Sequence, residues 1–324
     1  MDDGDGLVYA AILDGEGGAT EADWAGVRNW RADDGPIWVH LQRGNDTAER
    51  WLRNESGIDQ FTVQALLEED PRPRTSVVGD GVLAILRGVN LNPGSDPEDM
   101  VSIRVFATNE RIVTVRMRRL FSINTMREDL ANRVGARTAP GALGRLAEYL
   151  AARMEPVIED IEDWLGILEG AIGERRDGDL RRELHQIRRE AISLRRHMAP
   201  QREAMNRLAG LDTDLINPNQ RARLREVADR TMRYVEDLDA VRDRTAVLQD
   251  ELTTHMSEQM NRTMYLLTVV ATIMLPLGFL TGLLGVNVGG IPGADSPWAF
   301  AIFCGLLAAL VGVEVAVLKR LRWI

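Results

Sequence analysis

Hydrophobic and polar residues are unevenly distributed along the chain. Charged residues are frequent as far as Arg262, whereas the sequence from Thr263 to Leu318 contains no Lys or Arg and only two acidic residues, Asp295 and Glu314. This part contains two apolar runs of 21 residues, 264–284 and 298–318. At a rise of about 1.5 Å per residue, each run is long enough to cross a hydrocarbon core of about 30 Å. The pattern therefore predicts two transmembrane helices.

The charges that flank these runs predict their orientation. Arg262 precedes the first run, and Lys319, Arg320 and Arg322 follow the second, while the connecting loop 285–297 has no basic residue. Because basic residues stay on the cytoplasmic side, we expect both termini in the cytoplasm and the loop outside. The N-terminal sequence lacks the basic start and long apolar core of a signal peptide, which agrees with this orientation.

The two predicted spans differ in composition. The first contains Pro276 and, close to it, Gly278, Gly282 and Gly285. A proline removes a backbone donor from the helix, and small residues let neighbouring helices approach closely. Both features favour a helix packed inside a bundle. The second span is more uniformly apolar, so we expect it on the lipid-facing side.

A long helix is predicted before the first span. Asn217 and Pro218 are typical of a helix start, with Asn as the N-cap and Pro at the first helical position. From there to Leu284 the one strong helix breaker is Pro276. A stripe with alternating spacings of four and three supports a coiled-coil stalk: Val227, Thr231, Tyr234, Leu238, Val241, Thr245, Leu248 and Leu252. If continuous, this helix measures roughly 100 Å at 1.5 Å per residue.

Two further stripes precede this helix. One consists of Val157, Ile161, Trp164, Leu168 and Ile172. The other consists of Leu180, Leu184, Ile187, Ala191, Leu194 and Met198. Spacings of three and four residues are typical of helices that pack in a bundle or coiled coil. We therefore assign these residues to holding the stalk together and give them no part in binding ions.

The N-terminal part shows a different pattern, typical of strands alternating with helices. Strands are predicted at 7–13, 37–41, 82–89, 101–108 and 111–117. The last two are separated by Asn109 and Glu110 and should form a hairpin, and helical patterns lie near 47–68 and 119–133. The predicted organisation is an α/β domain at 1–150, a helical stalk region at 151–262 and a transmembrane domain at 263–324.

Composition excludes several classes of function. The formal charge of −10 argues against nucleic-acid binding and suits the attraction of cations. Cys304 is the single cysteine, so the chain can form neither an internal disulfide nor a zinc site built on several cysteines. The four histidines have no metal-ligand spacing, and we find neither a Gly-rich phosphate loop nor a catalytic triad. We expect no enzyme activity and no bound cofactor.

One segment carries a specific resemblance. Residues 261–287, NRTMYLLTVVATIMLPLGFLTGLLGVN, resemble the signature of the CorA-type metal ion transporters, whose first span starts at an Asn, carries a mid-membrane Pro and ends in Gly-Met-Asn. Here Val286 stands in place of the Met. The GVN sequence, the VGGIPG that follows it and the basic C-terminus are similar to the zinc transporter ZntB branch. Segments 71–90 and 194–203 also resemble the family, so the resemblance covers nearly the whole chain.

The resemblance implies an α+β membrane protein of the bacterial inner membrane that assembles as a homopentamer. It implies a cytoplasmic α/β funnel domain, a long stalk helix, an inner ring of first spans and an outer ring of second spans. Carried over residue by residue, the pore would be lined by Asn261, Met264, Leu267, Thr268, Leu275, Gly278, Gly285, Val286 and Asn287. Helical spacing places most of these residues along one side, with Asp250, about three turns before Asn261, at the cytoplasmic mouth.

These residue types suit the passage of a hydrated divalent cation. A ring of Asn287 amide oxygens can hydrogen-bond the water shell of an ion without removing it. Rings of Met264, Leu267 and Leu275 could close the pore by dewetting. A ring of Asp250 carboxylates could concentrate cations at the inner end, although a solvated stalk charge is the alternative interpretation of this residue.

Selectivity is predicted from two departures from the magnesium-transporter pattern. Gly278 stands where those transporters usually have a Thr, and Val286 replaces the Met of the motif. Both favour Zn²⁺ as the transported ion, with Mg²⁺, Co²⁺, Ni²⁺ and Cd²⁺ as other possible substrates. Glu314, an acid inside the second span, suggests a proton relay for proton-coupled uptake. Snorkelling to the interface or pairing with Lys319 explains Glu314 as well.

Three hypotheses follow for the function. The first is a zinc transporter, with proton-coupled uptake favoured over efflux. The second is a magnesium or cobalt channel of the same architecture. The third is a coiled-coil protein anchored in the lipid bilayer that forms no pore, in which the polar residues on one face of the first span have no function.

Overall fold

The computed structural model describes residues 3–175, 177–211, 215–286, 293 and 296–321. The chain folds as two compact units, Met1–Gln249 and Asp250–Ile324. A seven-stranded sheet forms the centre of the first unit, in the order β2-β1-β3-β7-β6-β5-β4. Its strands are β1 (Leu7–Leu13), β2 (Ala19–Glu21), β3 (Ile37–Gln42), β4 (Arg74–Val78), β5 (Gly81–Gly88), β6 (Val101–Ala107) and β7 (Arg111–Arg116).

The five predicted strands are confirmed, with ends that differ from the prediction by at most one residue. The predicted hairpin is also confirmed, because β6 and β7 pair antiparallel on either side of Asn109 and Glu110. The pairing of β3 with β7 is parallel and makes the sheet mixed. The two strands that the sequence pattern did not predict, β2 and β4, form the two edges of the sheet.

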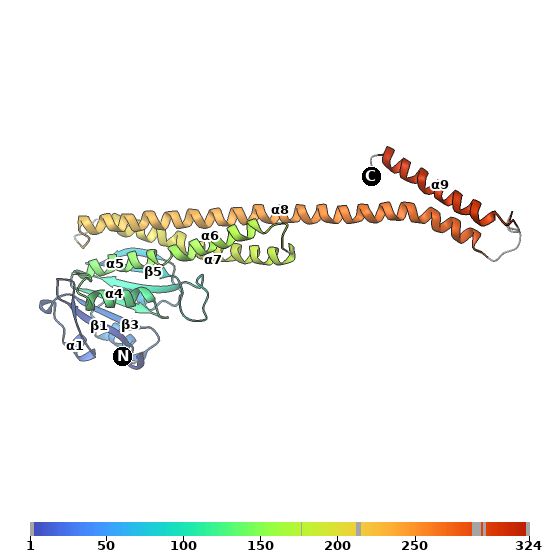
Figure 1. Ribbon diagram of the computed structural model, residues 1–324. Coiled ribbons are helices and arrows are strands. Elements are labelled where there is room, and N and C mark those ends of the chain that lie inside the picture. Colours follow the sequence, from blue (N-terminus) through green and yellow to red (C-terminus); the bar gives the residue numbers. More distant parts are fainter. Residues whose placement is uncertain (1–2, 176, 212–214, 287–292, 294–295, 322–324) are drawn as a thin grey trace. The chain divides into compact units, whose positions relative to one another are not determined.

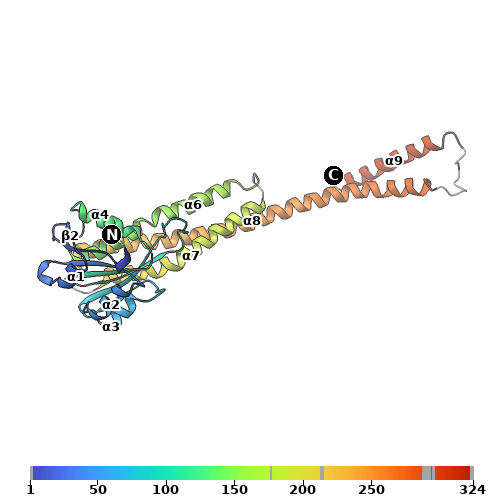
Figure 2. The same ribbon diagram turned by 90° about the horizontal axis from the view of Figure 1, so that it is seen from below.

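Helices cover both faces of this sheet. On one face α1 (Trp24–Asn29), α2 (Asp46–Asn54) and α3 (Gln60–Leu66) pack onto the apolar side chains of β3 and β7, and Figure 2 shows α2 and α3 on that side. On the other face lie α4 (Phe121–Ala131) and α5 (Ala139–Ala152), and α5 contacts β5, β6 and β7. Because both faces are covered, every residue of β5 is buried.

Three helices complete the first unit: α6 (Glu155–Gly170), α7 (Asp177–Gly210) and the first part of α8 (Pro218–Leu284). In Figures 1 and 2, α6 and α7 run alongside that part of α8. Ion pairs join the helices, since Arg244 of α8 reaches Glu169 of α6 at 2.6 Å and Arg195 of α7 reaches Asp239 of α8 at 2.6 Å. The predicted helical bundle is therefore confirmed.

The apolar stripes agree with the sequence in two of these three helices. All predicted stripe residues of α7 and α8 are buried. In α6 the predicted face is wrong by about one position, because the buried residues are Ile158, Ile161, Leu165 and Leu168, whereas Val157 and Trp164 are half-buried. The Trp164 indole instead lies at the edge of the contact and donates a hydrogen bond to Glu183 of α7 at 3.3 Å.

The start of α8 follows from its cap. The Asn217 side-chain oxygen accepts a hydrogen bond from the Gln220 backbone N–H at 2.8 Å, and the Gln220 side-chain oxygen accepts one from the Asn217 N–H at 3.0 Å. This reciprocal arrangement satisfies two otherwise unpaired donors at the first turn. The helix then continues through Pro276 to Leu284, so the long helix predicted from the sequence is confirmed.

The second unit contains the rest of α8 and the helix α9 (Ala299–Arg320). Both helices have a stretch that is long and apolar enough to cross a membrane. None of the residues in the most apolar window of α8 is buried, and only 6% of that window of α9 is buried. Apolar side chains so exposed require a cover from outside the chain, which a lipid bilayer or other copies of the chain would supply.

Candidate ion pathway along the first membrane span

Within the second unit, α8 and α9 each have one face that is less exposed than the others. On α8 the half-buried residues of the span are Val269, Ile273, Pro276, Leu277 and Leu280. On α9 the half-buried or buried residues are Ala299, Phe303, Leu307, Leu310, Val311, Glu314, Val315 and Leu318. Each set recurs at three and four residues and so forms one helix face. These two faces are therefore where α8 and α9 pack on each other, and Figure 1 shows α9 returning beside α8.

The residues predicted to line a pore lie on the other side of α8. At about 100° per residue, Met264, Leu267, Leu275 and Gly278 all lie at least about 120° around the helix from Ile273. The same holds for the other predicted residues of α8: Asp250, Asn261 and Thr268. The structure therefore brings the predicted residues together on the face of α8 that α9 leaves uncovered.

The apolar members of this face are strongly exposed. Met264 is 59% exposed, Leu267 is 65% exposed and Leu275 is 71% exposed. Apolar side chains at such exposure are not stabilised by burial within this chain. A neighbouring copy that placed the same face towards a common axis would bring these side chains into rings.

Thr268 supplies the polar group in the middle of this face. Its hydroxyl donates a hydrogen bond to the Met264 carbonyl at 2.8 Å, and the Thr272 hydroxyl does the same to the Thr268 carbonyl at 2.8 Å. Because the Thr268 proton is used within the helix, the oxygen presents its lone pairs outwards as acceptors. Water bound to a cation donates hydrogen bonds, so an acceptor at this position matches a hydrated ion.

The C-terminal end of the span in α8 depends on a glycine. The Gly285 backbone N–H donates to the Thr281 carbonyl at 2.9 Å, and a Cβ added at Gly285 would lie only 2.8 Å from that carbonyl oxygen. A larger residue would push the chain away from the end of α8, so this position needs Gly. Val286 follows and is 48% exposed. Asn287 lies outside the described residues, and its role stays a prediction.

On the N-terminal side of the span, Asp250 and Asn261 are both exposed. Within the part of the chain that the structure describes, no group of three or more His, Cys, Asp or Glu side chains is placed to hold a metal ion. Cys304 is exposed on α9. The described residues of the predicted pore face in one chain are therefore apolar side chains, a hydroxyl, an amide and, before the span, a carboxylate.

Glu314 lies on a different face from these residues. It belongs to the stripe of α9 that packs on α8, and its Oε2 atom is buried without a hydrogen-bond partner among the described residues. The stripe of α8 that it faces lies away from the predicted pore residues. The Glu314 side chain therefore lies between the two helices and away from the predicted pore residues.

The sequence pattern did not predict which side of α8 packs on α9. A span that is apolar on every side has no polar face to reveal its partners. The glycines and the proline of the first span were the available indication of its packing face. Of these, Pro276 belongs to the half-buried stripe of α8 that faces α9. That the predicted residues of α8 share one face follows from their spacing alone, and their role in a pore stays a prediction.

Comparisons with known proteins agree with this architecture over almost the entire chain. Residues 33–320 match the family model described as the CorA-like Mg2+ transporter protein. The divalent cation transporter CmaX of Pseudomonas aeruginosa is 39% identical, over 98% of this chain and 97% of its own length. The zinc transport protein ZntB of Pectobacterium carotovorum is also 39% identical, over 98% of this chain and 96% of its own length.

A solved structure extends the likeness to three dimensions. The structure of the full-length CmaX protein is similar with a TM-score of 0.87 and 39% identity, and the match covers 99% of each chain. Both units and both membrane helices therefore have counterparts in a protein of known structure. The two relatives share transport of divalent cations in their descriptions, and ZntB alone is described by zinc.

Proposed function

The chain belongs to the CorA-like family of divalent cation transporters, and we propose that it carries Zn²⁺ through a homopentameric pore lined by α8. One observation supports this arrangement above the others. The α9-facing stripe and the predicted pore residues occupy opposite sides of α8, so α9 can stay outside while α8 lines an axis. The third hypothesis, an anchor without transport, is wrong because the family consists of transporters.

The proposed orientation follows the distribution of charge. Residues 1–262 would form the cytoplasmic α/β domain and stalk, and the loop 285–297 would lie outside the bacterial inner membrane. Lys319 and Arg320 in the last turn of α9 would remain at the cytoplasmic surface, as Arg262 does before the first span. In this orientation a cation taken up from outside meets the GVN turn first and Asp250 last.

The proposed mechanism keeps the water shell of the ion. Neutral acceptors from Asn287 and Thr268 would hydrogen-bond the bound water, and no strong ligand set would hold the metal itself. Tight zinc sites are built from Cys and His, and an ion bound that tightly cannot leave quickly. The exposed apolar residues Leu267 and Leu275 would form the rings that exclude water when the pore is closed.

The choice of Zn²⁺ over Mg²⁺ rests on three supports. Gly278 stands where magnesium transporters of the CorA type usually have a Thr, so a polar ring of the pore would be missing. Val286 stands in place of the Met of their motif. A ZntB protein is as similar to this chain as CmaX is. The competing proposal, a Mg²⁺ or Co²⁺ channel, is supported by the description of the family model.

The proposed proton coupling depends on Glu314. An ionisable side chain inside a membrane span is costly and is a candidate for function, and the Oε2 atom of Glu314 is buried without a hydrogen-bond partner among the described residues. Among the described residues no ion pair joins it to Lys319, which weakens the pairing explanation. Zn²⁺ uptake that depends on a pH gradient would then require Glu314.

Flux into liposomes tests these proposals together. The purified protein is reconstituted into vesicles that contain an ion-sensitive dye, and Zn²⁺ or Mg²⁺ is added outside at equal pH or with the outside more acidic. We expect faster entry of Zn²⁺ than of Mg²⁺ and a further increase with the acidic exterior. Entry of Mg²⁺ alone, without an effect of pH, would overturn the zinc proposal.

Two variants separate the parts of the proposal. Asn287→Ala should abolish flux while the protein still assembles, which size-exclusion chromatography in detergent would verify. Undiminished flux in this variant would remove Asn287 from the pathway. Glu314→Gln should retain Zn²⁺ entry at equal pH and lose the response to the pH gradient, and a normal response would exclude the relay.

A further inference from the structure

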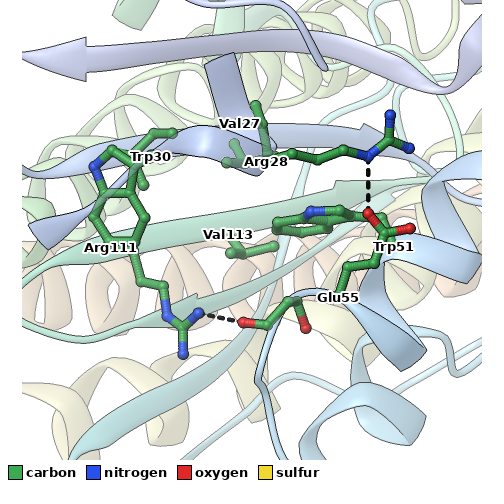
Figure 3. A pocket seen from close by; sticks show the side chains of 10 residues that line it. Val27, Arg28, Trp30, Trp51, Glu55, Arg111 and Val113 are labelled. Carbon is green, nitrogen blue, oxygen red and sulfur yellow. Dashed lines mark hydrogen bonds and ion pairs between the residues drawn. The ribbon is translucent and has the colours of Figure 1, made fainter. Parts of the chain in front are cut away.

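A pocket of about 430 Å³ lies in the first unit, far along the chain from the predicted pathway, and is shown in Figure 3. Its lining includes Ile37 and Val39 of β3, Val113 of β7, and the tryptophans Trp30 and Trp51. This volume falls within the range of about 300–1,000 Å³ that is typical of small-molecule sites. None of the lining residues takes part in the proposed transport.

One of the two arginines that line the pocket is already paired. The Arg28 Nε atom donates to Glu55 at 2.8 Å, and its guanidinium group also lies over the Trp24 ring, 5.4 Å from the ring centre. Arg28 and Glu55 therefore neutralise each other, and the Arg28 guanidinium group stacks on an aromatic face. This side of the pocket offers no net charge to a ligand.

The second arginine is different. Arg111 uses its Nη1 atom to donate to the Ser56 carbonyl, and among the described residues no hydrogen bond engages its Nε or Nη2 atom. Burial lowers the pKa of Arg111, yet a guanidinium group stays protonated at neutral pH. Figure 3 shows the two guanidinium groups on opposite sides of the pocket. Arg111 thus presents an unused donor edge beside an apolar cavity.

We propose that this pocket binds a small aromatic monocarboxylate, with its ring between the tryptophans and its carboxylate on Nε and Nη2 of Arg111. The planar donor edge of arginine matches the two oxygens of a carboxylate, and Trp30 and Trp51 match an aromatic body. Asp80 and Glu110 act electrostatically on Arg111, which favours a single negative charge over a dianion such as phosphate. The proposal is independent of the transported ion.

Binding of a matched pair of probes tests this proposal. The full-length protein in lipid nanodiscs is titrated with 4-fluorophenylacetate and with its uncharged amide, 4-fluorophenylacetamide, and fluorine NMR line widths report binding. Because charge-assisted hydrogen bonds are roughly twice as strong as neutral ones, we expect the acid to bind about tenfold more tightly than the amide. This comparison needs no variant. Equal affinities for the two probes would overturn the proposal.

Two substitutions assign the binding to Arg111. Arg111→Gln should remove the advantage of the acid, and the same sample corrects for partition of the probes into lipid. Arg74→Gln is the matched control, because Arg74 pairs with Glu68 on the exposed surface and does not line the pocket. If Arg111→Gln is unstable, Arg111→Lys keeps the charge without the planar fork and should show a weaker preference for the acid.

The remaining outcomes contradict the proposal. If neither probe binds, the pocket is closed to small molecules in the assembled protein, as it would be if another copy covered it. If Arg74→Gln weakens binding as much as Arg111→Gln, the carboxylate is attracted by general surface charge. If Arg111→Gln binds the acid as tightly as the unchanged protein, the ring and carboxylate lie elsewhere.

Discussion

The two parts of α8 present the same backbone to very different surroundings. Before residue 250, buried apolar side chains recur at three and four residues, and α6 and α7 cover them. After residue 262, apolar side chains occupy every side of the helix, and those of the span are mostly exposed. The distribution of apolar residues around a helix therefore indicates its surroundings. A single apolar stripe indicates a partner on one side, and apolar residues on every side indicate apolar surroundings on all sides.

Threonines show what the two parts have in common. In the first part Thr231 and Thr245 are fully buried, and their hydroxyls donate to the Val227 and Arg242 carbonyls at 2.8 and 2.7 Å. In the span Thr268 makes the same bond although its side chain is exposed. The internal bond satisfies the hydroxyl proton in both surroundings. The two parts differ in the surroundings of the threonine hydroxyl oxygen. It lies among packed side chains in the first part and is exposed in the span.

The largest effect is expected from removing a buried side chain of the first part. Leu238 is completely buried in the helical bundle, so Leu238→Ala should lower the free energy of unfolding by about 2–5 kcal/mol. Chemical denaturation followed by circular dichroism would measure the change. The control is Val247→Ala on the same helix, because Val247 is 66% exposed and should change stability by less than about 0.5 kcal/mol.

The control also tests the comparison. If Val247→Ala proves as destabilising as Leu238→Ala, then contacts between copies cover the exposed side of the first part. In that case, residues before 250 would also be covered by other copies, and the two parts of α8 would differ less than we infer.

The next effect concerns the two faces of the span. Leu275→Ala shortens an exposed side chain on the predicted pore face, so we expect faster resting leak of Zn²⁺ into liposomes and little change in thermal stability. Ile273→Ala shortens a half-buried side chain on the α9-facing stripe and should do the reverse, with a loss of about 1 kcal/mol in stability. If both variants leak equally, the assignment of faces is wrong.

The parts of the fold that were predictable have strong local patterns. The strands β1, β3, β5, β6 and β7 are runs of apolar residues between turn residues, and their central places in the sheet bury both faces. The membrane helices are as easily recognised, because length and apolarity suffice. The start of α8 was recognisable because Asn217 and Pro218 are specific for the first turn of a helix.

The missed elements have weaker patterns. The edge strand β2 has three residues, none fully buried, and β4 buries only Thr75. Helix α5 contains Pro140, Gly141 and Gly144, which read as breakers, but Thr138 caps its start through the Gly141 N–H at 3.0 Å. In each case the local sequence does not determine the secondary structure, and contacts with the rest of the fold do.

Candidate sites were predictable only where the family resemblance or spacing indicated them. The shared face of Met264, Leu275 and Gly278 follows from the helical period alone, and their role in a pore stays a prediction. The pocket beside Arg111 could not be foreseen, since its residues come from three separate stretches that meet only after the sheet forms. Its sequence signal is limited to tryptophans at 24, 30 and 51, which also suit an ordinary core.

A smaller effect is expected from pH on the first unit. Burial, with Arg87 and Arg196 nearby, lowers the pKa of His197 from 6.5 to about 4, and burial lowers the pKa of His40 to about 3. Between these values and 6.5 the unfolded chain binds more protons than the folded chain, so stability is full above about pH 6.5 and falls as the pH drops towards 4. Thermal unfolding at pH 7 and pH 5 should show the loss.

The variant His197→Asn assigns part of this dependence, because Asn does not titrate. Its unfolding temperature should fall less between pH 7 and pH 5 than that of the unchanged protein. An equally steep fall would mean that His197 is as easily protonated in the folded unit as in the unfolded chain.

The smallest effect separates two neighbouring acids at the start of the second unit. Asp250 and Glu251 are both exposed, but they point about 100° apart, and only Asp250 lies on the predicted pore face. Asp250→Asn should slow Zn²⁺ flux by roughly a factor of two at low ionic strength, because a ring of carboxylates raises the local cation concentration. The difference should shrink in high salt, where charges separated by more than about 3 Å are screened at 1 M. Glu251→Gln removes the same charge from the other side and should leave flux unchanged, so equal effects would show that net charge near the mouth matters and the face does not.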